Sequence, residues 1–228
     1  MTDAFRPDGL PVPRTDFEIA VVEFLVDLFE AYPTWGTHIG YHRVDGRWPD
    51  LTEAGRTARL AVMAGHRERL AGFADEVLMA DESVDRAILL GEIDKVVFDE
   101  EVLRSEAWDP LQTVYLVGGG LFGVLAREFA PWSERGAALV ARIEGLPELF
   151  SAALDALTGL PDRPVGLLQL ETALGQLPGV TDLVDSSVAE SKRRAEAGEA
   201  PELVAPIEAA ASAAHTAVET FRSGLDTS

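Results

Sequence analysis

Three glycines have the spacing of a dinucleotide-binding motif. Gly118, Gly120 and Gly123 form Gly-x-Gly-x-x-Gly, a pattern that lets backbone N–H groups approach a pyrophosphate where a β-strand turns into a helix. The preceding residues, 109–117, show no strand-like alternation, and no strand–helix–strand unit surrounds the motif. We therefore expect these glycines to permit close helix packing or a helix break, and not to bind a nucleotide.

Two histidines have the spacing of a zinc-binding helix. His38 and His42 lie four residues apart, which would place both rings on one helical face. Ile39 follows His38, so the glutamate base of a His-Glu-x-x-His metallopeptidase is missing. The nearby Gly36 and Gly40 also argue against a rigid helix. We interpret the pair as surface or loop histidines and expect no metal or other cofactor in this chain.

The acidic residues and serines offer no complete catalytic arrangement. Di-iron bundles need Glu-x-x-His pairs, and the sequence contains none. Ser133 and Ser151 lack the Gly-x-Ser-x-Gly turn that exposes a hydrolase nucleophile, so both are interpreted as caps or ordinary helix residues. No catalytic residue is expected. The following acidic run is interpreted as a solvated helix face: Glu92, Asp94, Asp99, Glu100 and Glu101.

Polar residues follow the longest apolar segment, 113–126. Arg127 and Glu128 end this segment, and Tyr115 lies near its start. Polar groups at the end of a buried helix can line a cleft. They can equally form a satisfied structural pair, which is the favoured interpretation. Tyr115, Arg127 and Glu128 are the candidate cleft-lining residues.

Composition limits the classes of partner. The 228 residues are 47% hydrophobic and carry a net charge of −20, from 39 acidic and 19 basic residues. This charge repels phosphate backbones and anionic lipids, so neither nucleic acid nor a membrane is an expected partner. The apolar segment is also shorter than the roughly 20 residues of a bilayer span. The absence of cysteine fits a reducing cytoplasm.

Helical periodicity dominates the first half of the chain. Thr15 and Glu18 have the spacing of a capping box, and apolar residues then recur at helical intervals until Pro33. Residues 34–50 are predicted to form a loop. Further helices are predicted over 52–78 and over 83–105, the latter capped by Ser83.

The second half is punctuated by proline. Helices are predicted over 111–129 and after Pro131, and a last helix runs from Pro201 to Gly224. Further helix boundaries are predicted at Pro147, Pro161, Pro164 and Pro178.

These patterns predict an all-α protein, a bundle-like array of about eight helices without a sheet. Residues 1–14 are expected to form a flexible arm, 15–224 a single helical domain with a sub-boundary near residue 108, and 225–228 a tail.

The order of several short segments resembles a bacterial family known as domain of unknown function 885. The resemblance covers about residues 32–221. Its segments are Tyr32-Pro33-Thr34, Gly40-Tyr41-His42, Asp45-Gly46-Arg47-Trp48-Pro49-Asp50-Leu51, Asp85-Arg86, Leu89-Leu90, Trp108-Asp109-Pro110, Tyr115, Gly119-Gly120-Leu121, Leu125-Ala126-Arg127-Glu128-Phe129-Ala130-Pro131, Arg135, Arg142-Ile143, Leu146-Pro147, Glu171-Thr172-Ala173 and Gln176-Leu177-Pro178-Gly179.

The resemblance implies a helical protein similar to zinc-dependent peptidases. The presumed metal motif of the family, a His-Glu segment followed by Pro-Gly-His-His, lies in a C-terminal half that this sequence does not contain. Zinc is therefore implied only for full-length relatives. The leading hypothesis is a helical N-terminal portion of a metallopeptidase-like protein, which forms a scaffold or cleft wall and is not catalytic by itself.

Two alternatives stay open. The chain can be a complete, non-enzymatic helical protein that docks a partner chain, or a protein that binds a small molecule in a helical pocket. The expected partners are thus a C-terminal catalytic half, a separate chain or a second copy. Surface built for such a partner would be apolar, and we expect it on 114–125 and on the last helix.

Overall fold

The computed structural model describes residues 9–226, so residues 1–8 of the expected arm and 227–228 of the expected tail lie outside it. Over the described range the chain forms nine α-helices and no sheet, with one isolated β-bridge between Leu160 and Arg163. The all-α prediction is confirmed, with one helix more than expected. No helix in this range is long and apolar enough to cross a bilayer.

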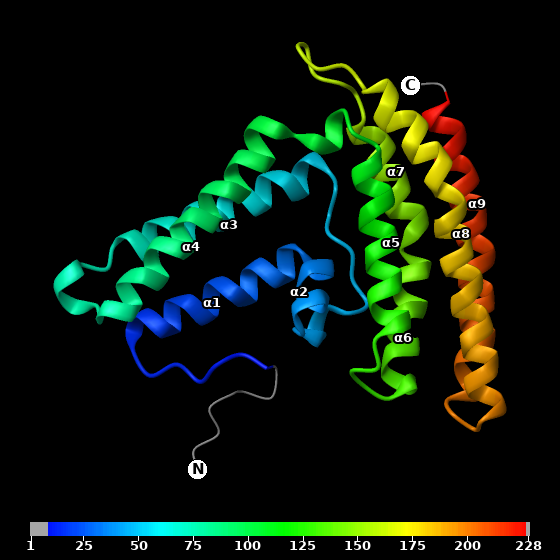
Figure 1. Ribbon diagram of the computed structural model, residues 1–228, viewed down its shortest axis with the longest axis horizontal. Helices are drawn as coiled ribbons and strands as arrows, with labels where there is room; N and C mark the ends of the chain where they lie inside the picture. Colours follow the sequence, from blue (N-terminus) through cyan, green and yellow to red (C-terminus); the bar gives the residue numbers. More distant parts are fainter. Residues whose placement is uncertain (1–8, 227–228) are drawn as a thin grey trace.

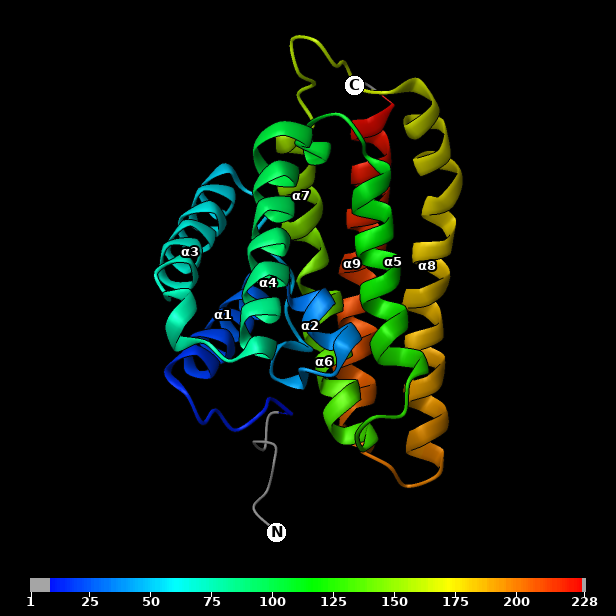
Figure 2. The same cartoon turned by 60° about the vertical axis from the view of Figure 1, so that its left-hand side comes forward.

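The first four helices form a layer on one side of the molecule (Figures 1 and 2). Helices α3 and α4 lie side by side, and α1 packs against α3. The bounds are Asp16–Ala31 for α1, Pro33–Ile39 for α2, Glu53–Ala71 for α3 and Ala80–Phe98 for α4.

The remaining five helices form a bundle beside that layer. Helices α8 and α9 run antiparallel along its outer side, and α5 packs against α8 (Figures 1 and 2). The bounds are Leu111–Ala126 for α5, Trp132–Glu144 for α6, Leu146–Ala156 for α7, Leu167–Glu196 for α8 and Val204–Leu225 for α9.

The buried side chains form two separate apolar clusters. One cluster lies among α1–α4 and is centred on residues such as Phe24, Met63 and Ile93. The other lies among α5–α9 and includes Leu139 and Phe221. The described residues therefore have two cores, and the chain passes from the α4 side of the first to the α5 side of the second between residues 97 and 111.

Several predicted boundaries in the first half are wrong. Residues 34–50 contain α2 and a short 3₁₀ turn, because Pro33 takes the first position of a new helix, where its missing N–H costs nothing. Helix α4 begins at Ala80 and not at Ser83. The capping box at Thr15 is half formed: Thr15 Oγ1 accepts the Glu18 N–H at 3.0 Å, but the Glu18 carboxylate accepts the Arg14 N–H.

The predicted boundary at Pro178 is also wrong, because Pro178 lies inside the 30-residue helix α8. An interior proline removes one helical hydrogen bond and costs about 3 kcal/mol. Leu177 and Val180, on either side of it, are buried in the bundle core. Burial of this face on both sides of the proline offsets the local cost.

One buried joint connects the layer to the bundle. The Trp48 indole N–H donates to the carbonyl oxygen of Arg142 at 2.7 Å. The Arg142 guanidinium, fully buried, lies over the Trp48 ring and donates to the Thr37 hydroxyl at 2.7 Å and to the Gly120 carbonyl oxygen. A side chain at Gly120 would overlap Trp48. The joint therefore holds α2 and the segment before α3 against α5 and α6.

Candidate functional site

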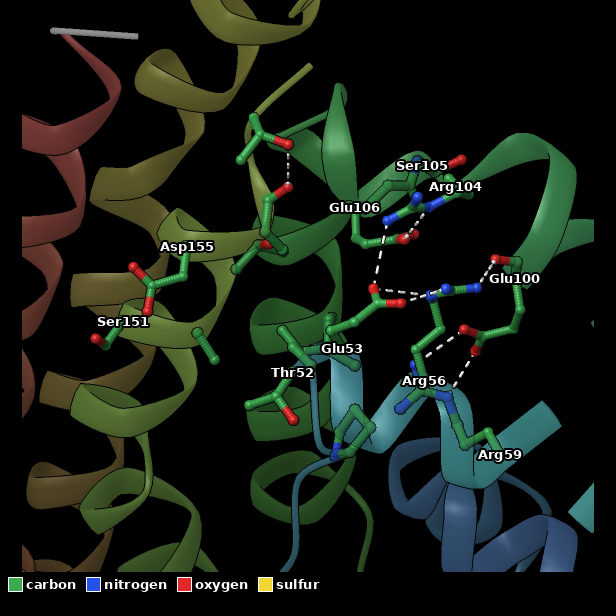
Figure 3. Close-up of a pocket in the computed structure, with 18 of the residues that line it drawn as sticks. Thr52, Glu53, Arg56, Arg59, Glu100, Arg104, Ser105, Glu106, Ser151 and Asp155 are labelled. Atoms are coloured by element: carbon green, nitrogen blue, oxygen red, sulfur yellow. Dashed lines mark hydrogen bonds and ion pairs between the residues drawn. The ribbon is translucent and has the colours of Figure 1, made fainter. Parts of the chain in front are cut away.

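A cleft of about 780 Å³ opens where the layer meets the bundle (Figure 3). The first turns of α3 and the segment after α4 form one wall, and α5 and α7 form the other. Its size is that of a small-molecule site. The lining combines apolar surface with charged groups from both sides, so the cleft is the candidate functional site.

The start of α3 is fixed by its cap. Thr52 Oγ1 accepts the Gly55 N–H at 3.1 Å, and the Asp50 carboxylate accepts the Thr52 N–H at 2.9 Å. Hydrogen bonds from the side chain and the backbone N–H of Thr52 lower the pKa of Asp50. Gly55 packs so closely on Asp50 that any side chain there would clash. The cap sets the direction in which the next turns of α3 present their side chains to the cleft.

An ion pair at the base of this wall is buried. Arg59 donates to both carboxylate oxygens of Glu100, at 2.6 and 3.0 Å, and the Tyr32 hydroxyl donates to the same carboxylate at 2.6 Å. Burial alone would lower the pKa of Arg59, but its bonds to Glu100 outweigh burial and raise it. The prediction that the acidic run is a solvated face is wrong for Glu100, which is buried between these two partners.

Arg56 extends the network toward the cleft. Its Nε donates to Glu53 at 3.0 Å, and its Nη1 donates to the backbone carbonyl of Glu100 at 3.1 Å. The hydrogen bond from Arg56 lowers the pKa of Glu53, whose side chain is largely exposed. Glu53 is therefore a surface carboxylate held on the rim by arginine.

Arg104 has an unusual backbone and loose partners. After α4 the chain makes a π-helical turn over Asp99–Leu103, and Arg104 then takes a left-handed conformation with φ +45°. This conformation costs a non-glycine residue of order 1–3 kcal/mol. The guanidinium lies 3.5 Å from Glu53 and 3.6 Å from Glu106, which is far looser than the pairing of Arg59.

The opposite wall is acidic. Glu148, Ser151 and Asp155 lie three and four residues apart and so share one face of α7. Figure 3 shows Ser151 and Asp155 on α7, across the cleft from Arg56 and Arg104. Neither carboxylate of this face has a cationic partner within residues 9–226. The cleft thus places unpaired carboxylates opposite an arginine-rich wall.

Tyr32 gives this wall a measurable signature at high pH. Burial, followed by the hydrogen bond to Glu100, raises the pKa of Tyr32 well above its usual value of 10. Above pH 10 the unfolded state loses this proton and the folded state keeps it, so folding stability falls as pH rises. We expect the Tyr32→Phe variant to lose that component of the pH dependence. Urea unfolding from pH 8 to 11.5 checks this, with Tyr115→Phe as the exposed control; equal slopes for Tyr32→Phe and the wild type would contradict it.

The three predicted cleft-lining residues lie elsewhere. Tyr115 is exposed on α5 and Arg127 donates to the carbonyl of His38 at 2.8 Å. Glu128 accepts from Arg194 at 2.5 Å beside a smaller hollow, and that hydrogen bond lowers its pKa. The structure does not bring the three together at the cleft, and their role in binding stays a prediction.

The glycine and histidine motifs are also separate from the cleft. Gly118, Gly120 and Gly123 lie inside α5, and only Gly120 is packed closely by a neighbour. His42 stacks on Phe129 with ring centroids 3.8 Å apart and hydrogen-bonds Asp45. Over the described part of the chain no three His, Cys, Asp or Glu side chains gather as a metal site.

The cleft residues were not found from the sequence because their partners are distant in it. Glu100 pairs with residues 41 and 68 positions away, and no local spacing reveals such contacts. The one available signal was the pair Arg56 and Arg59 in the first turns of a helix, next to the resemblance segment that ends at Leu51.

The comparisons with known proteins show the family and the fold. A solved structure described as "a putative lipoprotein of unknown function" from Shewanella oneidensis is 26% identical, with a TM-score of 0.81; the match covers 94% of this chain and 38% of that one. The chain thus spans well under half the length of that protein. No curated protein matches the sequence. The profile described as "Bacterial protein of unknown function (DUF885)" matches residues 33–228, and the chain belongs to this family.

Proposed function

We propose that this chain is the helical N-terminal portion of a longer, metallopeptidase-like protein, in which it forms one wall of a ligand cleft and is not catalytic by itself. The observation that carries the proposal is the cleft of about 780 Å³, which two separately cored helical units build together. The 38% coverage of the Shewanella protein is consistent with a role as part of a longer chain.

A scaffold role also fits the way the walls are fixed. On one side the cleft residues are held by a helix cap and a buried ion pair; on the other they project from a helix that packs into the bundle core. Sites on rigid elements keep their geometry when a ligand binds. The metallopeptidase-like part of the proposal comes from the family resemblance, in which the metal motif lies in a further C-terminal half.

Titration with zinc and a peptide-hydrolysis screen test the proposal. We expect the 228-residue chain to show neither stoichiometric zinc binding nor turnover, and a polypeptide that continues into the metal motif to show both. Stoichiometric zinc binding with turnover by this chain alone would overturn the non-catalytic role. A His38→Ala/His42→Ala variant then identifies whether the histidine pair is responsible.

A second candidate is a non-enzymatic protein that docks a partner chain. It is favoured by large apolar side chains that are exposed in rows: Tyr115 and Phe122 on α5, and Val84, Ile88 and Phe98 on α4. The prediction of an apolar patch on the last helix is wrong, because the apolar stripe of α9 is buried in the bundle. Purification from the native source decides between the two: a longer polypeptide that carries this segment eliminates the docking protein.

A further inference from the structure

The free hydrogen-bonding capacity of the arginine wall is concentrated on Arg104. Arg59 donates to the Glu100 carboxylate and to the carbonyl oxygen of Asp50, and Arg56 donates to Glu53 and to the carbonyl oxygen of Glu100. Arg104, in contrast, has only two loose ion pairs, through Nη2 to Glu53 at 3.5 Å and through its buried Nε to Glu106 at 3.6 Å, and a third of its side chain is exposed. A guanidinium presents five donors in a planar fork that suits a carboxylate. Arg104 is therefore able to accept a further anionic group.

The backbone conformation at Arg104 also supports a role in binding. A left-handed residue with no glycine-like freedom persists only where the surroundings or the function require it, and such residues are common at binding sites. The π-helical turn that precedes Arg104 is also a feature that recurs at functional sites. The π-helical turn and the left-handed residue together place the Arg104 guanidinium on the cleft lining, where Glu53 and Glu106 flank it.

The bundle side of the cleft offers the opposite chemistry. Glu148 and Asp155 line it without a cationic partner, and Ser151 lies between them on α7. Thr113 of α5 also lines the cleft; it is only 8% exposed, and its hydroxyl has no hydrogen-bond partner within residues 9–226. This hydroxyl is open to the cleft and offers a further polar contact to a ligand.

We propose that the cleft binds a zwitterionic ligand, with a carboxylate on Arg104 and a protonated amine on Glu148, Ser151 and Asp155. The inference rests on the proposed function, in which this cleft receives a ligand, and adds its chemical class. A dicarboxylate would meet the carboxylates of α7, and a diamine would meet Arg104, so charge selects a molecule that carries both groups. Free amino acids and short peptides share this chemistry.

Isothermal titration of the full chain with blocked peptides tests the charge assignment. The probes are trialanine, N-acetyl-trialanine and trialanine amide, each missing at most one terminal charge. We expect acetylation and amidation each to weaken binding about tenfold or more, the usual effect of losing a charged hydrogen bond. L-Alanine distinguishes the two sources: equal affinity indicates a free amino acid, and tighter binding of trialanine indicates a peptide.

Two variants assign each charge to its wall. The Arg104→Gln variant should bind trialanine and N-acetyl-trialanine about tenfold more weakly and bind trialanine amide with unchanged affinity. The Asp155→Asn variant should bind trialanine and trialanine amide about tenfold more weakly and bind N-acetyl-trialanine with unchanged affinity. Arg67→Gln and Asp182→Asn, which change the same charges outside the cleft, should leave every affinity unchanged. The Arg104→Gly variant relieves the strain of the left-handed backbone, so it should be at least as stable as the wild type. It should still lose the interaction with the ligand carboxylate.

The outcomes separate this inference from the proposed function. Amidated and acetylated probes that bind as well as trialanine would overturn the zwitterion assignment. Succinate or 1,4-diaminobutane that binds more tightly than trialanine would overturn the zwitterion assignment. If Arg104→Gln abolished the binding of succinate, or Asp155→Asn that of the diamine, the cleft would still be a ligand site. Absence of saturable binding by every probe would overturn both the assignment and the cleft's role as a ligand site.

Discussion

The Arg142→Ala variant is expected to lower the free energy of unfolding by about 3–5 kcal/mol. Arg142 is 0% exposed, and its guanidinium donates to the Thr37 hydroxyl and to the Gly120 carbonyl oxygen. Burial lowers its pKa to about 10, against the nearby charge of Asp45, so the side chain stays protonated at neutral pH. The alanine variant removes two charged hydrogen bonds and leaves a cavity beneath Trp48.

Urea unfolding at pH 7, followed by circular dichroism, measures this loss. Arg222→Ala removes the same side chain from an exposed site in the last turn of α9 and should change stability by no more than about 0.5 kcal/mol. Arg142→Lys keeps the charge but cannot reach both acceptors in a planar fork, and should fall between the wild type and Arg142→Ala. If Arg142→Ala behaved like Arg222→Ala, the joint would not depend on the guanidinium.

Substituting alanine at two adjacent glycines of α5 should have opposite effects. The Gly120→Ala variant should lose about 1–3 kcal/mol, because its methyl group would lie 2.6 Å from Trp48 Cη2 and 3.2 Å from Thr34 Cγ2, and the ring would have to move. The Gly119→Ala variant should gain about 0.5–1 kcal/mol, because nothing lies near the new methyl group and alanine is the better helix former.

The pair is its own control, since both changes add one methyl group to the same helix. Thermal unfolding of the two variants and the wild type in one buffer gives the comparison. Equal shifts of the midpoint in both variants would contradict the close approach of Trp48 to α5. A Gly120→Ala/Trp48→Phe double variant should recover part of the loss, because the smaller ring leaves room for the methyl group.

Helices that bury one continuous stripe could be predicted from the sequence. Phe17, Phe24 and Leu28 of α1 and Ile207, Val218 and Phe221 of α9 recur at helical intervals and are buried as expected. Periodicity reports which face a helix buries. It is silent on which other helix covers that face, so the two cores and the joint between them were not available from the sequence.

Boundaries marked by proline could be predicted only in part. Pro131 precedes a helix as expected, whereas Pro178 lies inside one. The sequence gives the free-energy cost of a proline inside a helix. Whether the helix continues through the proline depends on how much apolar surface its face buries in the folded protein. The same limit applies to the cleft: Glu100 belongs to an acidic run that looks solvated, and its burial depends on Arg59 and Tyr32 from other helices.

Two cores within one chain have a consequence for how the molecule opens. Each cluster packs mainly its own helices. The contacts that cross between them include the joint at Trp48, the stack of His42 on Phe129 and the hydrogen bond from Arg127 to the His38 carbonyl. Regions with separate cores can exchange their amide protons as separate cooperative units. The cleft lies on that seam, so a fluctuation that separates the units would widen the cleft without melting either one. The rate at which a ligand reaches the bottom of the cleft would then depend on how often the two helical units move apart.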